Sequence, residues 1–313
     1  MGKVAFLFAG QGAQYVGMGK ELIDNFETAR KIFDMADEVL GYKISEICFN
    51  GPEERLKETA NTQPAILTHS VACYFLLKEE GIVPNVVAGL SLGEYSALVA
   101  AESIDFEEAV PLVRKRGIYM QEAVPLGRGA MAAVIGLEKQ EVLRVCELAS
   151  EAGIVEAANF NCPDQIVISG EVRAVEKAVE IAKGKGARKA VMLHVSAPFH
   201  CSLLKPAGEK LAVELGKVHI KSAKIPLISN VTADPVSDGA TIKELLVKQV
   251  SSPVLWEDSV NKMKEMGVDT FVELGPGRAL SGFVKKIDRS LVTLNVEDVE
   301  SLRKTIAFFR GRK

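Results

Sequence analysis

The chain has 313 residues, of which 48% are hydrophobic and 25% are charged, and 38 Lys+Arg against 41 Asp+Glu give a formal net charge of −3. This balance argues against a basic nucleic-acid-binding protein and against general attraction to anionic membranes. Five cysteines without Cys-x-x-Cys spacing argue against a disulfide scaffold and a zinc site, and favour the reducing cytoplasm. The apolar run at residues 4–9 is too short for a signal peptide, and no run approaches the ~18 residues of a membrane span.

The N-terminal segment predicts a buried strand at residues 4–9, followed by a glycine-rich loop that contains Gly10, Gln11 and Gly12. Nucleotide-binding templates fail here. A dinucleotide fingerprint needs glycine where Tyr15 stands, and a phosphate-binding Walker loop needs lysine where Met18 stands. We therefore expect a tight backbone passage with exposed N–H groups beside an active site.

Apolar spacing predicts a helix over residues 20–40 and another over 65–80, with Thr62 as its N-cap and Pro64 in its first turn. His69 lies inside the second helix among apolar neighbours, and we interpret it as a packing histidine.

The most informative stretch is an apolar run at 86–89 that leads into Gly89-Leu90-Ser91-Leu92-Gly93 and then into a helix-forming run to residue 101. This is the strand–turn–helix context of a nucleophile elbow, in which glycines let two backbone segments meet. The helix N-terminus behind Ser91 would stabilise a developing oxyanion. The alternative is that Ser91 is only a helix N-cap, but the correct flanks favour a nucleophile.

A helix predicted over 106–121, opened by Ser103 or Asp105, carries Arg114, Lys115 and Arg116. Three successive cations usually form a solvated face, but their apolar neighbours allow one of them to point inward.

The middle of the chain has a β-α-β-β-α-β order, which is that of a ferredoxin-like unit. Its predicted strands lie at 130–135, 155–160, 165–169 and 190–195, and its helices at 139–152 and 172–182. We predict a small lobe of residues 126–195 inserted into a large α/β lobe of residues 1–125 and 196–313. A site is expected between the two lobes.

The C-terminal third returns to alternating helices and strands. The predicted helices are 203–215, 242–250, 254–265 and 279–286, and the predicted strands are 225–230 and 270–274.

A serine nucleophile needs a base, because its hydroxyl is a poor nucleophile at neutral pH. Besides His69, the sequence has His194 in a strand pattern, His219 in an alternating run typical of a strand surface, and His200 in a loop. A loop just past the small lobe can bring a base to the cleft, so His200 is favoured over His194. Its neighbour Cys201 is a rival nucleophile, but it lacks a second base.

Several motifs together resemble the malonyl-CoA:acyl-carrier-protein transacylases of fatty-acid synthesis over nearly the full length. The matching segments are 8–12, 62–64, 89–94, 116–117, 120–121, 159–161, 197–200, 249, 253–254 and 273–277. The resemblance implies an α/β-hydrolase-like large lobe with an inserted ferredoxin-like small lobe. It also implies malonyl-CoA and acyl carrier protein as partners. It implies no cofactor and no metal. We expect a monomer.

The resemblance also implies a role at each matching position. Ser91 would carry the acyl ester, His200 would be general base and acid, and the backbone N–H groups of Gln11 and Leu92 would form the oxyanion hole. The backbone carbonyl of Gln249 would orient the histidine. Gln63 and Asn159 would belong to the active site.

Arg116 would pair with the free carboxylate of the malonyl group, because a planar guanidinium grips a carboxylate with two hydrogen bonds. The sequence departs from the family at Leu90, where a histidine is usual, and a leucine cannot exchange a proton.

Acyl carrier proteins are acidic, so a local basic surface is expected to receive one despite the net negative charge. The candidate clusters are Lys183, Lys185, Arg188 and Lys189, and Lys285 with Lys286. Two alternatives share the elbow: a serine hydrolase, which wants a carboxylate partner for the histidine, and a docking module that keeps the fold without catalysis.

Overall fold

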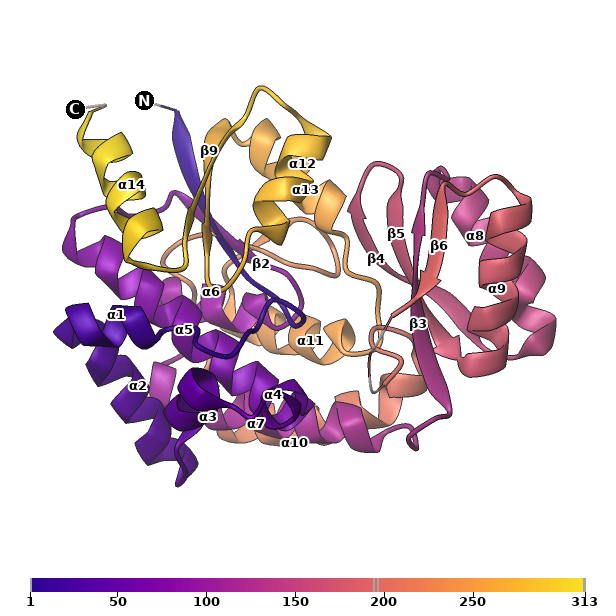
Figure 1. Ribbon diagram of the computed structural model, residues 1–313, viewed down its shortest axis with the longest axis horizontal. Coiled ribbons are helices and arrows are strands. Elements are labelled where there is room, and N and C mark those ends of the chain that lie inside the picture. The colour runs from indigo at the N-terminus through magenta and orange to yellow at the C-terminus, as the bar shows by residue number, and fades with distance from the viewer. Residues whose placement is uncertain (1, 194, 196, 312–313) are drawn as a thin grey trace.

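The computed structural model describes residues 2–193, 195 and 197–311, and shows two β-sheets with helices packed around them (Figure 1). His194, one of the two candidate bases, lies outside the described residues. Among those that are described, no helix is both long and apolar enough to cross a membrane.

The larger sheet has the strand order β10-β9-β1-β2-β7-β8, in which only the short edge strand β8 runs antiparallel. Its strands are β1 (Lys3–Phe8), β2 (Val86–Gly89), β7 (Leu227–Ile228), β8 (Pro235–Val236), β9 (Val268–Leu274) and β10 (Val292–Val296). In β1, residues 5–8 are all fully buried, because helices cover both faces of the sheet. The predicted strand at the N-terminus is confirmed.

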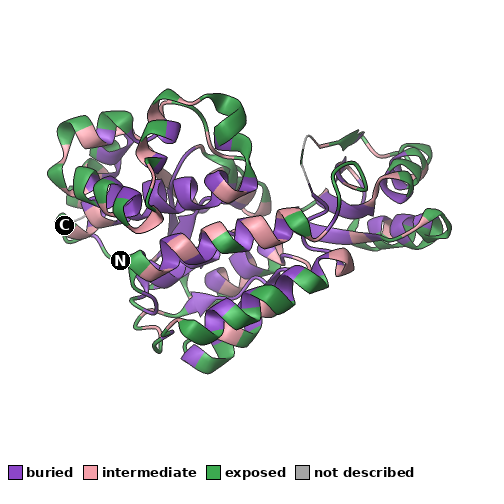
Figure 2. Ribbon diagram, turned by 90° about the horizontal axis from the view of Figure 1, so that it is seen from below, coloured by how far each residue is buried: buried purple, intermediate pink, exposed green. Residues whose placement is uncertain are grey.

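Helices from before and after the antiparallel-sheet segment surround this sheet, and the strands between them form the buried centre (Figure 2). They are α1 (Lys20–Asn25), α2 (Glu27–Leu40), α3 (Ile44–Asn50), α4 (Glu53–Lys57), α5 (Thr59–Glu79), α6 (Gly93–Ala100), α7 (Phe106–Glu122), α10 (Lys205–Lys217), α11 (Gly239–Gln249), α12 (Trp256–Glu265), α13 (Ala279–Ile287) and α14 (Val299–Arg310). A short 3-10 turn at Ser202–Leu204 precedes α10.

The smaller sheet is antiparallel with the order β4-β5-β3-β6, and helices α8 and α9 cover its outer face (Figure 1). Its elements are β3 (Gly129–Ile135), α8 (Lys139–Ala149), a 3-10 turn at Ser150–Ala152, β4 (Val155–Cys162), β5 (Gln165–Glu171), α9 (Val172–Gly184) and β6 (Lys189–Met192). The β-α-β-β-α-β order expected from the sequence is confirmed. The apolar stripe of α9, which includes Val175 and Val179, packs into this sheet's own core.

One face of the antiparallel sheet packs into the large core through Met131, Ala158 and Val167, and polar contacts join the same sheet to its neighbours. Asn159 of β4 forms an isolated parallel bridge with Val254, ahead of α12. Lys286 Nζ of α13 donates to Gln165 Oε1 of β5 at 2.8 Å. The chain enters and leaves the antiparallel sheet at one place, since a Cβ on Gly129 would lie 2.3 Å from Pro198 Cδ.

Some predicted boundaries are wrong. The helix expected over 20–40 is two helices, because Phe26 takes an extended conformation between them. Thr62 is not an N-cap: α5 starts at Thr59, Pro64 lies inside it, and the Thr62 hydroxyl donates to Leu56 O. His219 is exposed as expected, but it lies in a loop and not in a strand. The final strand and helix, β10 and α14, were not predicted.

Candidate active site

The sharp turn between β2 and α6 is built as a nucleophile elbow. Ser91 has a φ of 54°, a strained conformation for a residue with a side chain. The two glycines that flank it are required by contact. A Cβ on Gly89 would lie 1.9 Å from Gly93 C, and one on Gly93 would lie 2.1 Å from Phe8 O. The turn therefore holds Ser91 at the start of α6 and at the carboxyl ends of β1 and β2.

His200 meets Ser91 from a different part of the chain. Its Nε2 lies 2.7 Å from Ser91 Oγ, and its Nδ1 lies 2.8 Å from the backbone oxygen of Gln249. Because a carbonyl only accepts, Nδ1 carries the proton and Nε2 is free to accept from the serine hydroxyl. Burial, then the charge of Arg116, lowers the pKa of His200 to about 4. The imidazole is therefore neutral at pH 7, as a general base must be.

Arg116 of α7 reaches the same hydroxyl and is 1% exposed. Its Nη1 donates to Gln63 Oε1 at 2.9 Å, and its Nη2 donates to Ser91 Oγ at 3.1 Å and to Gln249 Oε1 at 3.0 Å. Arg116 Nε has no hydrogen-bond partner among the described residues. A buried cation with a free donor is suited to receive an anionic group.

The other two cations of this run point away. Lys115 pairs with Glu214 at 2.6 Å, and the Arg114 guanidinium lies 5.2 Å from the centre of the Tyr42 ring. The expectation that one cation of three points inward is confirmed.

Two polar residues of the site were missed by the sequence analysis. Asn230, which follows β7, accepts the Ser91 N–H at 2.6 Å and donates to Gly89 O at 2.8 Å. Glu94 is buried on α6 and accepts from the Asn230 N–H at 3.1 Å and from Gln249 Nε2 at 2.8 Å. The only sequence signals were a carboxylate three residues after Ser91 and an asparagine that ends a predicted strand.

The loop after β1 passes directly against the elbow, since a Cβ on Gly10 would lie 2.5 Å from Leu90 O. Within the described part of the chain, the N–H groups of Gln11 and Leu92 have no hydrogen-bond partner. Asn159 is buried on β4, but no hydrogen bond between described residues joins its side chain to Ser91 or His200. The Leu90 side chain packs partly into the core beside the parallel sheet.

The remaining candidates stand apart from this cluster. His69 is fully buried and its Nε2 donates to Glu297 O at 2.9 Å, which confirms a packing histidine. Cys201 is buried, its thiol donates to Pro198 O, and burial raises its pKa to about 11. That thiol is therefore a poor rival nucleophile. The described residues contain no group of three His, Cys, Asp or Glu side chains placed to hold a metal ion.

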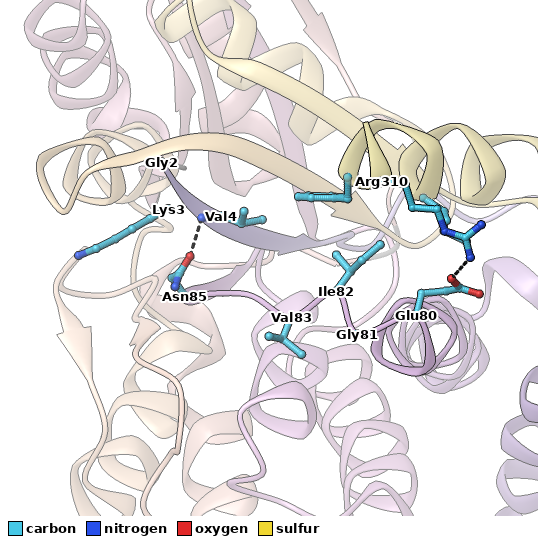
Figure 3. Close-up of a pocket in the computed structure, with 11 residues that line it drawn as sticks. Gly2, Lys3, Val4, Glu80, Gly81, Ile82, Val83, Asn85 and Arg310 are labelled. Atoms are coloured by element: carbon cyan, nitrogen blue, oxygen red, sulfur yellow. Dashed lines mark hydrogen bonds and ion pairs between the residues drawn. The ribbon is translucent and has the colours of Figure 1, made fainter. Parts of the chain in front are cut away.

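A cavity of about 530 Å³ lies elsewhere, around the start of β1 and the end of α14 (Figure 3). Ile82 and Val83 line it, and Arg310 pairs with Glu80 at its rim. Ser91 lies at the carboxyl ends of the parallel strands β1 and β2, and this cavity lies at their amino ends. The cavity is therefore not part of the cluster around Ser91.

Comparison with known proteins gives consistent matches. The acyl transferase domain family matches residues 5–304. A malonyl CoA-acyl carrier protein transacylase of Bacillus subtilis (strain 168) is 52% identical over 98% of this chain and 97% of its own.

Solved structures agree with this match. A crystal structure of malonyl CoA-acyl carrier protein transacylase from Clostridium perfringens ATCC 13124 is 52% identical, with a TM-score of 0.96 over 99% of this chain and 98% of that one. A structure of a type II PKS acyl-carrier protein in complex with its malonyl-transacylase is 42% identical, with a TM-score of 0.96 over 98% and 99% of the two chains.

Proposed function

This chain belongs to the acyl transferase family, among its malonyl CoA-acyl carrier protein transacylases, and we propose that it transfers the malonyl group through an ester on Ser91. The observation that carries the proposal is the Ser91 hydroxyl, which lies 2.7 Å from His200 Nε2 and 3.1 Å from Arg116 Nη2. One hydroxyl thus faces both a neutral base and a buried cation.

In the first half-reaction, His200 Nε2 takes the hydroxyl proton while Ser91 Oγ bonds to the thioester carbon of malonyl-CoA. The tetrahedral oxyanion would accept hydrogen bonds from the N–H groups of Gln11 and Leu92, which have no other partner in the described chain. The C–S bond then breaks, and the departing coenzyme A thiolate takes the proton from His200.

In the second half-reaction, the phosphopantetheine thiol of acyl carrier protein gives its proton to His200 and attacks the ester carbon. The C–O bond to Ser91 breaks and the serine recovers the proton. This ping-pong order uses one histidine twice, as base and then as acid. The Gln249 carbonyl supports it by holding Nδ1–H, so that Nε2 always faces the serine.

Arg116 would bind the malonyl carboxylate by exchanging its contact with Ser91 Oγ for two hydrogen bonds to the substrate. Gln63 and Gln249 hold the guanidinium from two sides and keep it in place before the substrate arrives. We place Asn159 at the wall of the same site, on the strand that bridges to Val254.

We divide the chain into an α/β-hydrolase-like lobe of residues 1–125 and 196–313 and an inserted ferredoxin-like lobe of residues 126–195. The face of the antiparallel sheet that α8 and α9 cover has a core of its own, which supports this division, while Met131, Ala158 and Val167 on its other face pack into the large core. Ser91, His200 and Arg116 come from one chain, so a monomer suffices. The five cysteines are unpaired, which suits the cytoplasm.

The carrier-protein surface that we propose joins the two basic clusters at one end of the antiparallel sheet. Ile135 of β3 is in register with Lys189 on one side and with Gln165 on the other, and Gln165 binds Lys286. The two lysines thus flank three neighbouring strands. In the small-lobe cluster, Lys185 is partly neutralised by Glu141 at 3.1 Å.

The decisive experiment is the intact-protein mass after brief exposure to malonyl-CoA, beside Ser91→Ala. We expect a gain of one malonyl group in the wild type only, and its discharge by added acyl carrier protein. Release of free malonate without an acceptor would instead indicate a hydrolase. Neither adduct nor coenzyme A release would support the docking module and turn attention to Leu90.

A further inference from the structure

Glu94 is a buried carboxylate that the reaction described above does not use. It lies on the first turn of α6, three residues after Ser91, and is 1% exposed. A buried carboxylate is costly unless it is paired or hydrogen-bonded, so its two recorded partners carry information about its role. Both hydrogen bonds are made by a single oxygen, Oε2.

The first partner leads to the nucleophile. The Asn230 N–H donates to Glu94, and the Asn230 side chain then accepts the Ser91 N–H at 2.6 Å and donates to Gly89 O. Asn230 therefore closes the strained turn on both sides of Ser91. Glu94 holds the backbone from which that side chain extends.

The second partner leads to the base and the cation. The amide of Gln249 lies between two charges: its Nε2 donates to Glu94, and its Oε1 accepts from Arg116 at 3.0 Å. With the amide reversed, its NH2 group would face the guanidinium and its oxygen would face the carboxylate. Glu94 and Arg116 together therefore permit only one orientation of the Gln249 side-chain amide. The backbone oxygen of the same residue orients His200.

We propose that Glu94 is a charged positioning residue that fixes Asn230 and Gln249 and offsets the positive charge that His200 gains when it takes the Ser91 proton. In a Ser-His-Asp triad a carboxylate contacts the histidine directly. Here the backbone carbonyl of Gln249 contacts the histidine instead, and the Glu94 carboxylate acts through the side chain of that same glutamine. The inference rests on the proposed function, since it assigns a role in that same acylation step.

The charged surroundings of Glu94 are simple. Arg116 of α7 favours its ionised form, and the neighbouring Tyr95 of α6 contributes a ring and a hydroxyl whose own pKa burial raises to about 12. Burial outweighs Arg116 and the two N–H donors and raises the pKa of Glu94 to about 7. The carboxylate therefore loses its charge as the pH falls through about 7, while His200 stays neutral down to about 4.

Glu94→Gln isolates the charge, because the glutamine oxygen still accepts from Asn230 and Gln249. We expect the second-order rate constant for acylation of Ser91 by malonyl-CoA, measured in single-turnover experiments, to fall about tenfold at about pH 8.5. The ratio of wild-type to variant rates, in which substrate ionisation cancels, should fall toward about one below about pH 6.

The control is Glu273→Gln on β9, although this variant loses one of the two oxygens that accept hydrogen bonds. Glu273 is also a buried carboxylate with a raised pKa, but it accepts from the N–H groups of Leu280 and Ser281. For Glu273→Gln, the ratio of wild-type to variant acylation rates should be independent of pH. A Glu94→Gln ratio that is likewise constant with pH, or a variant as fast as wild type throughout, overturns the proposal. Failure of the wild type itself to form the adduct would instead refute the proposed function.

Discussion

The guanidinium of Arg116 is held by three neighbours, Gln63, Ser91 and Gln249, and in the proposed function the same fork binds the malonyl carboxylate. Arg116→Lys keeps the charge but loses the planar pair of donors. We expect kcat/KM for malonyl-CoA to fall by about ten- to a hundredfold, with a smaller loss for acetyl-CoA, which has no carboxylate.

Arg114→Lys is the control for that experiment, because Arg114 lies over the Tyr42 ring and points away from Ser91. It should leave both substrates nearly unaffected. An equal loss on malonyl-CoA and acetyl-CoA in Arg116→Lys would show that the residue serves the serine and not the carboxylate.

His69 lies outside the active site, and its burial makes a prediction about the pH dependence of folding stability. Burial lowers its pKa to about 4, so between about pH 6.5 and 4 the unfolded chain binds a proton that the folded chain does not. Stability contributed by the neutral form is therefore lost as the pH falls through this window.

His69→Gln keeps a donor for Glu297 O but does not titrate. Between pH 7.5 and 5 the wild type should lose about 2 kcal/mol more unfolding free energy than this variant, as measured by urea denaturation. Parallel losses in the two proteins would contradict the buried neutral histidine. Glu94 and His200 titrate in both proteins and cancel in the difference.

Sequence alone pointed to Ser91, His200 and Arg116, through a short motif and the family resemblance, and the structure brings these three side chains together. Glu94 and Asn230 escaped for a physical reason. Their importance lies in long-range contacts: Glu94 bonds Asn230 and Gln249 at separations of 136 and 155 residues along the chain. No local pattern marks an asparagine that bonds a distant backbone N–H.

At the scale of elements, the turn between β2 and α6 depends on the absence of two side chains. Gly89→Ala would place a methyl group 1.9 Å from Gly93 C, and backbone cannot yield as a flexible side chain does. We expect a loss of about 3 kcal/mol in unfolding free energy together with loss of the malonyl adduct.

Gly216→Ala is the matched control in α10, where nothing lies within 4 Å of the added Cβ. Helix propensity predicts that it is neutral or stabilising by up to about 1 kcal/mol. A Gly89→Ala protein with normal stability and normal acylation would contradict the close backbone packing of the elbow.

Periodicity located the long elements well and their ends poorly. The four strands and two helices of the antiparallel sheet follow the predicted order because α8 and α9 each bury one apolar stripe and the strands are short, mostly buried apolar runs. Thr62 failed as an N-cap because its hydroxyl is used by Leu56 O inside a longer helix. Phe26 broke a predicted helix because its extended backbone separates α1 from α2, a choice that apolar spacing does not encode.

At the scale of the whole molecule, the two basic clusters predict how the carrier protein is recognised. Charge reversal at Lys189 and Lys286 should raise KM for acyl carrier protein about tenfold or more and leave acylation by malonyl-CoA almost unchanged. Lys31→Glu, on the distant helix α2, is the control. An equal loss with both substrates would rule out this surface.

The arrangement of the two sheets lay beyond sequence reasoning. The alternation of strands and helices indicated two lobes, but not that β1 would lie between β9 and β2, or that Lys286 would reach Gln165. Strand order joins segments that are distant in the chain, and no single segment carries that information.

The contact between Gly129 and Pro198 makes the intervening segment exchangeable as a cassette. Both ends of the segment meet at one point, so recombination between relatives could replace it without stretching the remainder of the chain. His200 follows only two residues after Pro198, so a junction placed before Pro198 would leave the base on the recipient's side. If the carrier protein docks on this segment as proposed, such an exchange would change the acceptor preference and leave Ser91, His200 and Arg116 in place.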